Sequence, residues 1–212
     1  MQTRTIAIAP IAAALLAVLG GIALGEQSGQ DKYSLTVPDG LSFAEIKGYE
    51  SWQTVAVSET KTQVKAILGN QATIDAYKEG IPGNGKPFPE GAKWAKIQWN
   101  KKENPNSPYF VEIPATLASV AFVIKDSKRF PNTHGYAFGQ FDYDTATGTF
   151  KTGTLGSVPI SGFECGYACH AAHVASRDYI FTAYAAVGSV GALLTMAGVW
   201  TPRRHADRHT ES

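Results

Sequence analysis

The chain has 212 residues, of which 44% are hydrophobic and 17% charged, and its formal net charge is +1. This composition excludes disordered and collagen-like chains, and the length fits one domain of about 150 residues with additional segments. Because a charge near zero provides no basic surface for a phosphate backbone, we expect no nucleic-acid partner.

Residues 1–25 have the pattern of a signal peptide. An uncharged run from Ile6 to Leu24 follows Arg4, and the small residues around Leu24 resemble a signal-peptidase site before Glu26. The run is longer than a usual signal core, so an uncleaved anchor is the alternative. Both interpretations place the domain outside the cytoplasm, and we expect it in the periplasm.

The residues after this segment predict a linker and then one folded domain over residues 41–183. Residues 26–40 are polar and interrupted by Gly and Pro, which is typical of a linker. Asn70 is a candidate N-cap for a helix that ends at Gly80. A short helix is expected at 41–46, and strands are expected at 53–57, 63–68, 93–99, 117–125, 136–143 and 149–151.

These elements predict the α+β class, mainly an antiparallel β-sheet with short helices. We find no amphipathic helix between strands that is long enough for a parallel crossover. Alternation in the strand at 93–99 places Trp94 and Lys96 on one face and Ala95 and Ile97 on the other.

Residues 184–212 form an apolar segment with a basic tail. The uncharged run at 184–200 has about 17 residues, the lower limit for a spanning helix, and Arg203 and Arg204 follow it. Basic residues after a span are typical of a cytoplasmic tail. The run is therefore either a membrane anchor or a buried C-terminal helix.

Both cysteines of the chain, Cys165 and Cys169, lie just before His170. A disulfide is the simplest interpretation for an exported protein, although so short a loop strains the bond. Covalent attachment of haem by two thioethers, with the histidine after the second cysteine as iron ligand, is the second. A zinc site that includes His173 is the third, but Cys169 and His170 are adjacent and cannot readily face one tetrahedral ion.

If iron is bound, the sequence contains few candidates for a second axial ligand. Met196 lies in the apolar segment, and His173 lies on the same side as His170. His134 is in a loop, where a histidine is usually a surface group. We therefore expect an open iron position that binds a small molecule.

Over roughly residues 40–184 the chain resembles the cytochrome P460 family of exported c-type haem proteins. The similar segments occur in family order: Gly48-Tyr49-Glu50-Ser51-Trp52, Ile67-Leu68-Gly69-Asn70, Phe88-Pro89-Glu90-Gly91-Ala92-Lys93-Trp94-Ala95-Lys96, Lys125-Asp126-Ser127-Lys128-Arg129-Phe130-Pro131, Cys169-His170 and Asp178-Tyr179-Ile180-Phe181-Thr182.

The resemblance implies a largely β fold, usually a homodimer, with one covalent haem c per chain held by Cys165, Cys169 and the proximal ligand His170. Its open face would bind hydroxylamine or nitric oxide. In the enzymatic members a lysine bonded to the haem accompanies hydroxylamine oxidation, and its position corresponds to Lys96. Electrons would pass to a periplasmic acceptor such as a soluble cytochrome c.

Two departures from the family pattern bear on activity. The cysteines are separated by three residues, one more than in the family motif, which puts the second thioether in doubt. Val120-Ala121-Phe122 stand where enzymatic members have a distal carboxylate, and Lys65 stands at an arginine position. Hydroxylamine oxidation must release protons, so an apolar replacement favours binding of an uncharged gas.

We therefore expect a periplasmic c-type haem protein with an open iron site that binds or oxidises small nitrogen compounds. The alternative is a non-catalytic exported binding domain whose two cysteines form a disulfide or a zinc site.

Overall fold

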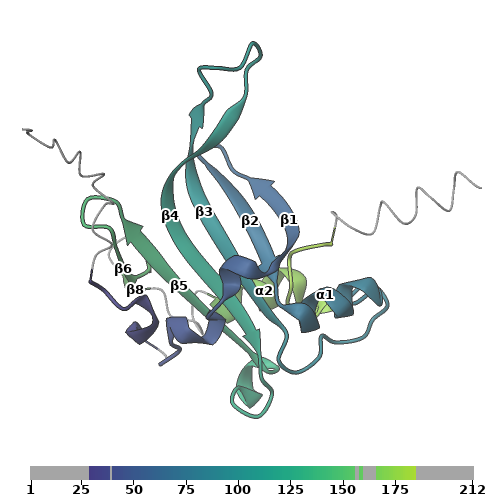
Figure 1. The fold of residues 1–212 in the computed structure, drawn as a ribbon. Coiled ribbons are helices and arrows are strands. Elements are labelled where there is room, and N and C mark those ends of the chain that lie inside the picture. The colour runs from purple at the N-terminus through teal and green to yellow at the C-terminus, as the bar shows by residue number, and fades with distance from the viewer. Residues whose placement is uncertain (1–28, 39, 156–157, 160–165, 185–212) are drawn as a thin grey trace, which may run out of the picture.

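The computed structural model describes residues 29–38, 40–155, 158–159 and 166–184 (Figure 1). The predicted signal peptide, Cys165 and the apolar segment after Tyr184 lie outside the described residues. Within the described residues, no helix has the length and apolar character needed to cross a membrane.

The domain is built on a six-stranded antiparallel sheet in which each strand pairs with the next along the chain. The strands are β1 (Gln53–Glu59), β2 (Gln63–Gly69), β3 (Lys93–Glu103), β4 (Glu112–Lys125), β5 (Tyr136–Asp144) and β6 (Thr149–Thr152). Short strands β7 (Thr154–Leu155) and β8 (Val158–Pro159) form a separate pair.

The helices are short. They are α1 (Gln71–Lys78), α2 (Ala168–Val174) and the 3₁₀ helices η1 (Lys32–Ser34), η2 (Phe43–Ile46), η3 (Tyr49–Ser51), η4 (Pro131–Thr133) and η6 (Ala175–Arg177). The predicted α+β class is therefore confirmed, as are the six predicted strands and the helix after Asn70. The Asn70 side chain accepts a hydrogen bond from the Thr73 amide at 3.1 Å, as expected of an N-cap, and another from the Lys93 amide at 3.0 Å.

The hairpin between β3 and β4 is longer than predicted. Both strands continue beyond the rest of the sheet and form an arm (Figure 1). The arm is mostly polar on both faces, so it lacks the alternation that identifies a half-buried strand. At its tip, Tyr109 and Phe110 are 78% and 77% exposed.

Each face of the sheet packs against its own apolar core. One core gathers the N-terminal helices over Phe122, Val120 and Phe141. The other joins α1 to the opposite face through Ile74, Tyr77 and Trp94; Phe138 and Ile180 belong to the same core.

Residues 30–38, predicted to be linker, instead pack on the sheet. Gln30 exchanges two hydrogen bonds of 2.7 Å with the backbone of Phe150, and Val37 is buried. The packed part of the chain therefore begins about ten residues before Leu41, because the polar run contains apolar side chains that cover the first core.

Candidate functional site

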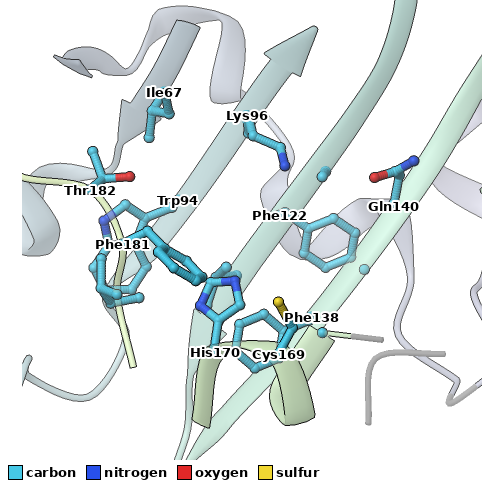
Figure 2. A pocket seen from close by; sticks show the side chains of 15 residues that line it. Ile67, Trp94, Lys96, Phe122, Phe138, Gln140, Cys169, His170, Phe181 and Thr182 are labelled. Atoms are coloured by element: carbon cyan, nitrogen blue, oxygen red, sulfur yellow. The ribbon is translucent and has the colours of Figure 1, made fainter. Parts of the chain in front are cut away.

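A cavity of about 420 Å³, the pocket, lies between the sheet and α2. This size is in the range of cofactor sites, about 300–1,000 Å³. Its walls are mostly apolar and come from β2, β3, β4, β5, α2 and the segment after η6 (Figure 2): Ile67, Trp94, Lys96, Ala121, Phe122, Val123, Phe138, Gly139, Gln140, Gly166, Cys169, His170, Ile180, Phe181 and Thr182.

Strand register explains which side chains meet on the sheet side. Residues directly opposite one another in antiparallel strands share a face. One row across four strands is Ile67, Lys96, Ala121 and Gln140, and the neighbouring row is Gly69, Trp94, Val123 and Phe138. The predicted placement of Trp94 and Lys96 on one face of their strand is therefore confirmed.

Phe122 belongs to the other face. It lies in the core under the N-terminal helices, and its ring also borders the pocket. A Cβ on Gly139 would overlap the ring of Phe122, so the absence of a side chain there lets the ring pack across β5.

His170 projects from α2 into the pocket. Its Nδ1 lies 2.6 Å from the backbone carbonyl oxygen of Tyr179. A carbonyl oxygen can only accept, so Nδ1 carries the proton and donates. Nε2 is then the unprotonated nitrogen, which is the form that binds a metal ion.

The surroundings of His170 favour its neutral form. Burial lowers the pKa of His170, the positive charge of Lys96 acts in the same direction, and the hydrogen bond to Tyr179 opposes them. A neutral imidazole is ready to donate its Nε2 lone pair to iron without first losing a proton.

Cys169 lines the pocket while remaining exposed to solvent. Successive residues of an α-helix point about 100° apart, so the Cys169 thiol and the His170 ring leave α2 in different directions. Cys165 lies outside the described residues. In the part of the chain that the structure describes, no three His, Cys, Asp or Glu side chains are grouped to hold a metal ion.

The other two histidines considered from the sequence do not line the pocket. His173 is exposed one turn beyond His170 on α2. His134 is also exposed; its Nδ1 lies 2.6 Å from the Tyr167 hydroxyl, and its ring stacks on Tyr179. His134 thus lies beside the segment that supports His170 rather than across the pocket from it.

Lys96 is half-buried and points its amine into the pocket from β3 (Figure 2). Burial lowers the pKa of Lys96, the charge of Lys65 lowers it further, and Cys169 acts in the opposite direction. Its amine therefore loses its proton more readily than that of a solvated lysine, as a nucleophilic lysine requires. Lys65 itself does not line the pocket; it lies one row further along the same face of the sheet.

Gln140 is a pocket residue that the sequence did not indicate. It lies opposite Ala121, and its Nε2 donates to Asp142 at 2.9 Å, while the other carboxylate oxygen of Asp142 accepts from the Thr154 amide. The wall beside Ala121, expected to be apolar, therefore includes the amide of Gln140. The alternation of β5 can be read from the sequence. The nearness of Gln140 to Lys96 cannot, because it depends on the pairing of β5 with β4 and of β4 with β3.

The pocket suits a haem. An apolar, aromatic wall would contact a macrocycle, Nε2 of His170 is available to iron, and the Cys169 thiol is within the same wall. When bound, haem supplies the redox and ligand-binding chemistry. The chain would offer His170 as the iron ligand, Gln140 as a polar group and Lys96 as an amine.

The model of a protein family, described as "Cytochrome P460", matches residues 46–182, about two thirds of the chain. No curated protein matches the chain significantly. The matched residues include every pocket residue described above, so the chain belongs to the cytochrome P460 family and is a haem protein.

Proposed function

We propose that the protein is a periplasmic c-type haem protein with an open iron position that binds or oxidises a small nitrogen compound, hydroxylamine or nitric oxide. The supporting observation is that the two sides of the pocket carry different kinds of side chain. His170 offers a neutral nitrogen from α2, whereas the facing row on the sheet is Ile67, Lys96, Ala121 and Gln140.

That facing row favours an exogenous ligand at the sixth position. Among the described residues that line the pocket, His170 is the one histidine, and no methionine is present. A protein without a second strong axial ligand leaves iron open for ligand chemistry rather than for electron transfer alone.

The polarity of the facing row favours binding over turnover. Ala121 and Ile67 suit an uncharged gas, and Gln140 can offer one amide hydrogen bond. Oxidation of hydroxylamine would send electrons to an acceptor such as a soluble cytochrome c and protons to a base. The row contains no carboxylate, so oxidation is the slower of the two proposed activities.

Attachment of the haem is proposed through thioethers to Cys165 and Cys169, one haem per chain. The exposed position of the Cys169 thiol beside His170 supports this arrangement. We further propose export by the signal peptide at 1–25, association as a homodimer, and membrane attachment through residues 184–200.

The test is production of the full chain in a host with a cytochrome c maturation system. We expect brown or green protein whose denatured mass exceeds the polypeptide mass by one haem, and a Soret band that shifts with nitric oxide. His170→Ala should abolish the native spectrum. His173→Ala is the matched control on the same helix and should preserve it.

Two results would contradict the proposal. A colourless wild-type protein of bare polypeptide mass would favour the alternative of a disulfide or zinc binding domain. A spectrum that is unchanged in His170→Ala would show that this residue is not the proximal ligand.

A further inference from the structure

The direction of the His170 ring depends on one backbone carbonyl. His170 donates from Nδ1 to the oxygen of Tyr179, nine residues later in the chain. This bond determines both the tautomer of the ring and the direction in which Nε2 points. Whatever holds the Tyr179 carbonyl in place therefore also holds the proposed iron ligand.

The Tyr179 carbonyl is held by an unusual backbone turn. Asp178 and Tyr179 both have positive φ, 48° and 62°. A non-glycine residue in this region is strained and persists only when its surroundings impose the conformation. Aspartate tolerates the conformation better than most residues, whereas tyrosine does not, so two consecutive residues of this kind need an anchor.

The carboxylate of Asp178 provides that anchor. Its Oδ2 accepts a hydrogen bond of 2.6 Å from the Phe88 amide and one of 2.5 Å from the Tyr136 hydroxyl. Both donors are buried, with Phe88 2% and Tyr136 1% exposed. They come from the loop before β3 and from β5, so Asp178 fastens the turn to the sheet independently of α2.

The backbone completes the connection between this anchor and α2. The Tyr179 amide donates to the Val174 carbonyl at 3.0 Å, and the Ile180 amide donates to the Arg177 carbonyl. The Tyr179 ring also stacks on His134 and on Tyr167. The turn therefore spans from the end of α2 to the sheet, with the carbonyl that receives His170 at its centre.

We propose that Asp178 is a positioning residue for the iron ligand: by fixing the left-handed turn at Asp178 and Tyr179, it aims the Tyr179 carbonyl at His170 and thereby sets the direction and donor strength of Nε2. This inference rests on the proposed function, because it assumes that His170 binds the haem iron. It assigns a role to a residue that contacts neither the pocket nor the ligand.

Asp178→Ala removes both hydrogen bonds and the residue type that tolerates the turn. We expect the holoprotein to show a downward shift and broadening of the iron–histidine stretching band in resonance Raman spectra of the ferrous form. The reduction potential should rise, because a less firmly hydrogen-bonded histidine donates less charge to ferric iron.

Two milder variants separate positioning from loss of folding. Tyr136→Phe deletes one donor and should produce a smaller shift of the same sign. Asp178→Asn retains an oxygen acceptor and a residue type that tolerates the turn. Its iron–histidine band should therefore lie close to that of the wild type. Asp126→Asn is the matched control, because the Asp126 carboxylate also accepts two hydrogen bonds, here from the backbone amides of Lys128 and Arg129 in an exposed turn.

The outcomes distinguish this inference from the proposed function. The proposed function requires that the wild type has an iron–histidine band and that this band is lost in His170→Ala. If either condition is not met, the proposed function fails. If the wild type has the band but Asp178→Ala leaves its position and the potential unchanged, only the inference fails. If Asp178→Ala does not load haem, the inference requires a downward shift of the band in Tyr136→Phe, and a wild-type spectrum in that variant would overturn it.

Discussion

Lys96 lies directly opposite Ala121 in the register of β3 and β4, and both side chains face the pocket. The side chain on β4 that lies opposite the Lys96 amine is therefore a methyl group. A carboxylate at this position would accept a proton from a substrate at iron, as the resemblance to enzymatic members implies. The proposed preference for ligand binding over substrate oxidation therefore rests on this pair.

Ala121→Glu should convert the protein toward an oxidase. A positioned general base contributes about 10²–10⁴-fold to proton transfer, so we expect hydroxylamine-dependent reduction of a dye acceptor to rise by at least about tenfold. Ala121→Gln is the control of equal size that lacks a base. Equal rates in the two variants would show that proton transfer does not limit oxidation.

Lys96 is predicted to bond to the haem ring. Tryptic digestion of the holoprotein should release a haem-linked peptide that contains Lys96, and the absorption of the wild type should lie to the red of that of Lys96→Ala. Lys65→Ala, one row away on the same face, serves as the comparison and should retain the link. An identical spectrum in wild type and Lys96→Ala would make Lys96 an ordinary strand lysine.

The amine of Lys96 is predicted to become reactive at lower pH than a solvated lysine. Burial and then the charge of Lys65 lower the pKa of Lys96 from its ordinary value of 10.5, so its neutral fraction rises earlier as pH increases. Acetylation of unloaded protein, followed by peptide mass spectrometry, should give a lower midpoint for Lys96 than for a lysine in a short solvated peptide. Lys65→Met removes a like charge and should raise the midpoint; no movement would exclude that coupling.

Gln140 is predicted to donate a hydrogen bond to the iron-bound ligand. One hydrogen bond is worth about 0.5–1.5 kcal/mol, so Gln140→Leu should weaken nitric oxide binding about 2- to 10-fold. The stretching frequency of bound carbon monoxide should rise in the same variant. Gln53→Leu on exposed β1 is the control. Unchanged affinity and frequency in Gln140→Leu would place the amide out of reach of the ligand.

Gly166 is predicted to be required for the contact of α2 with the sheet. A Cβ at this position would overlap Cβ of Phe138, which lies under the ring of His170. Overpacking of this kind costs about 1–3 kcal/mol, so Gly166→Ala should lower the free energy of unfolding by that amount. Gly29→Ala has open space around it and should leave stability unchanged; equal denaturation curves for both variants would contradict the close contact.

The amino-acid sequence carries enough local information for most of the sheet. Six strands and the helix capped by Asn70 follow from alternation and capping, because these signals depend on neighbours a few residues away. The same local pattern places Lys96 on a face opposite Ala95, and the adjacency of Cys169 and His170 is legible without any fold.

The tertiary structure adds the relations between distant segments. Gln140 reaches the neighbourhood of Lys96 because two strand pairings place Ala121 between them, and register is a property of whole strands rather than of single residues. The packing of residues 30–38 likewise depends on an apolar surface that the folded sheet creates.

Asp178 illustrates the same limit at the proposed iron ligand. In the sequence it is one acidic residue in a polar stretch, eight positions after His170. Its carboxylate becomes an anchor only when Phe88 and Tyr136 arrive with buried donors, 90 and 42 residues away in the chain. Local propensity cannot encode such a site, because the energy that holds the turn comes from groups that only the completed fold brings together.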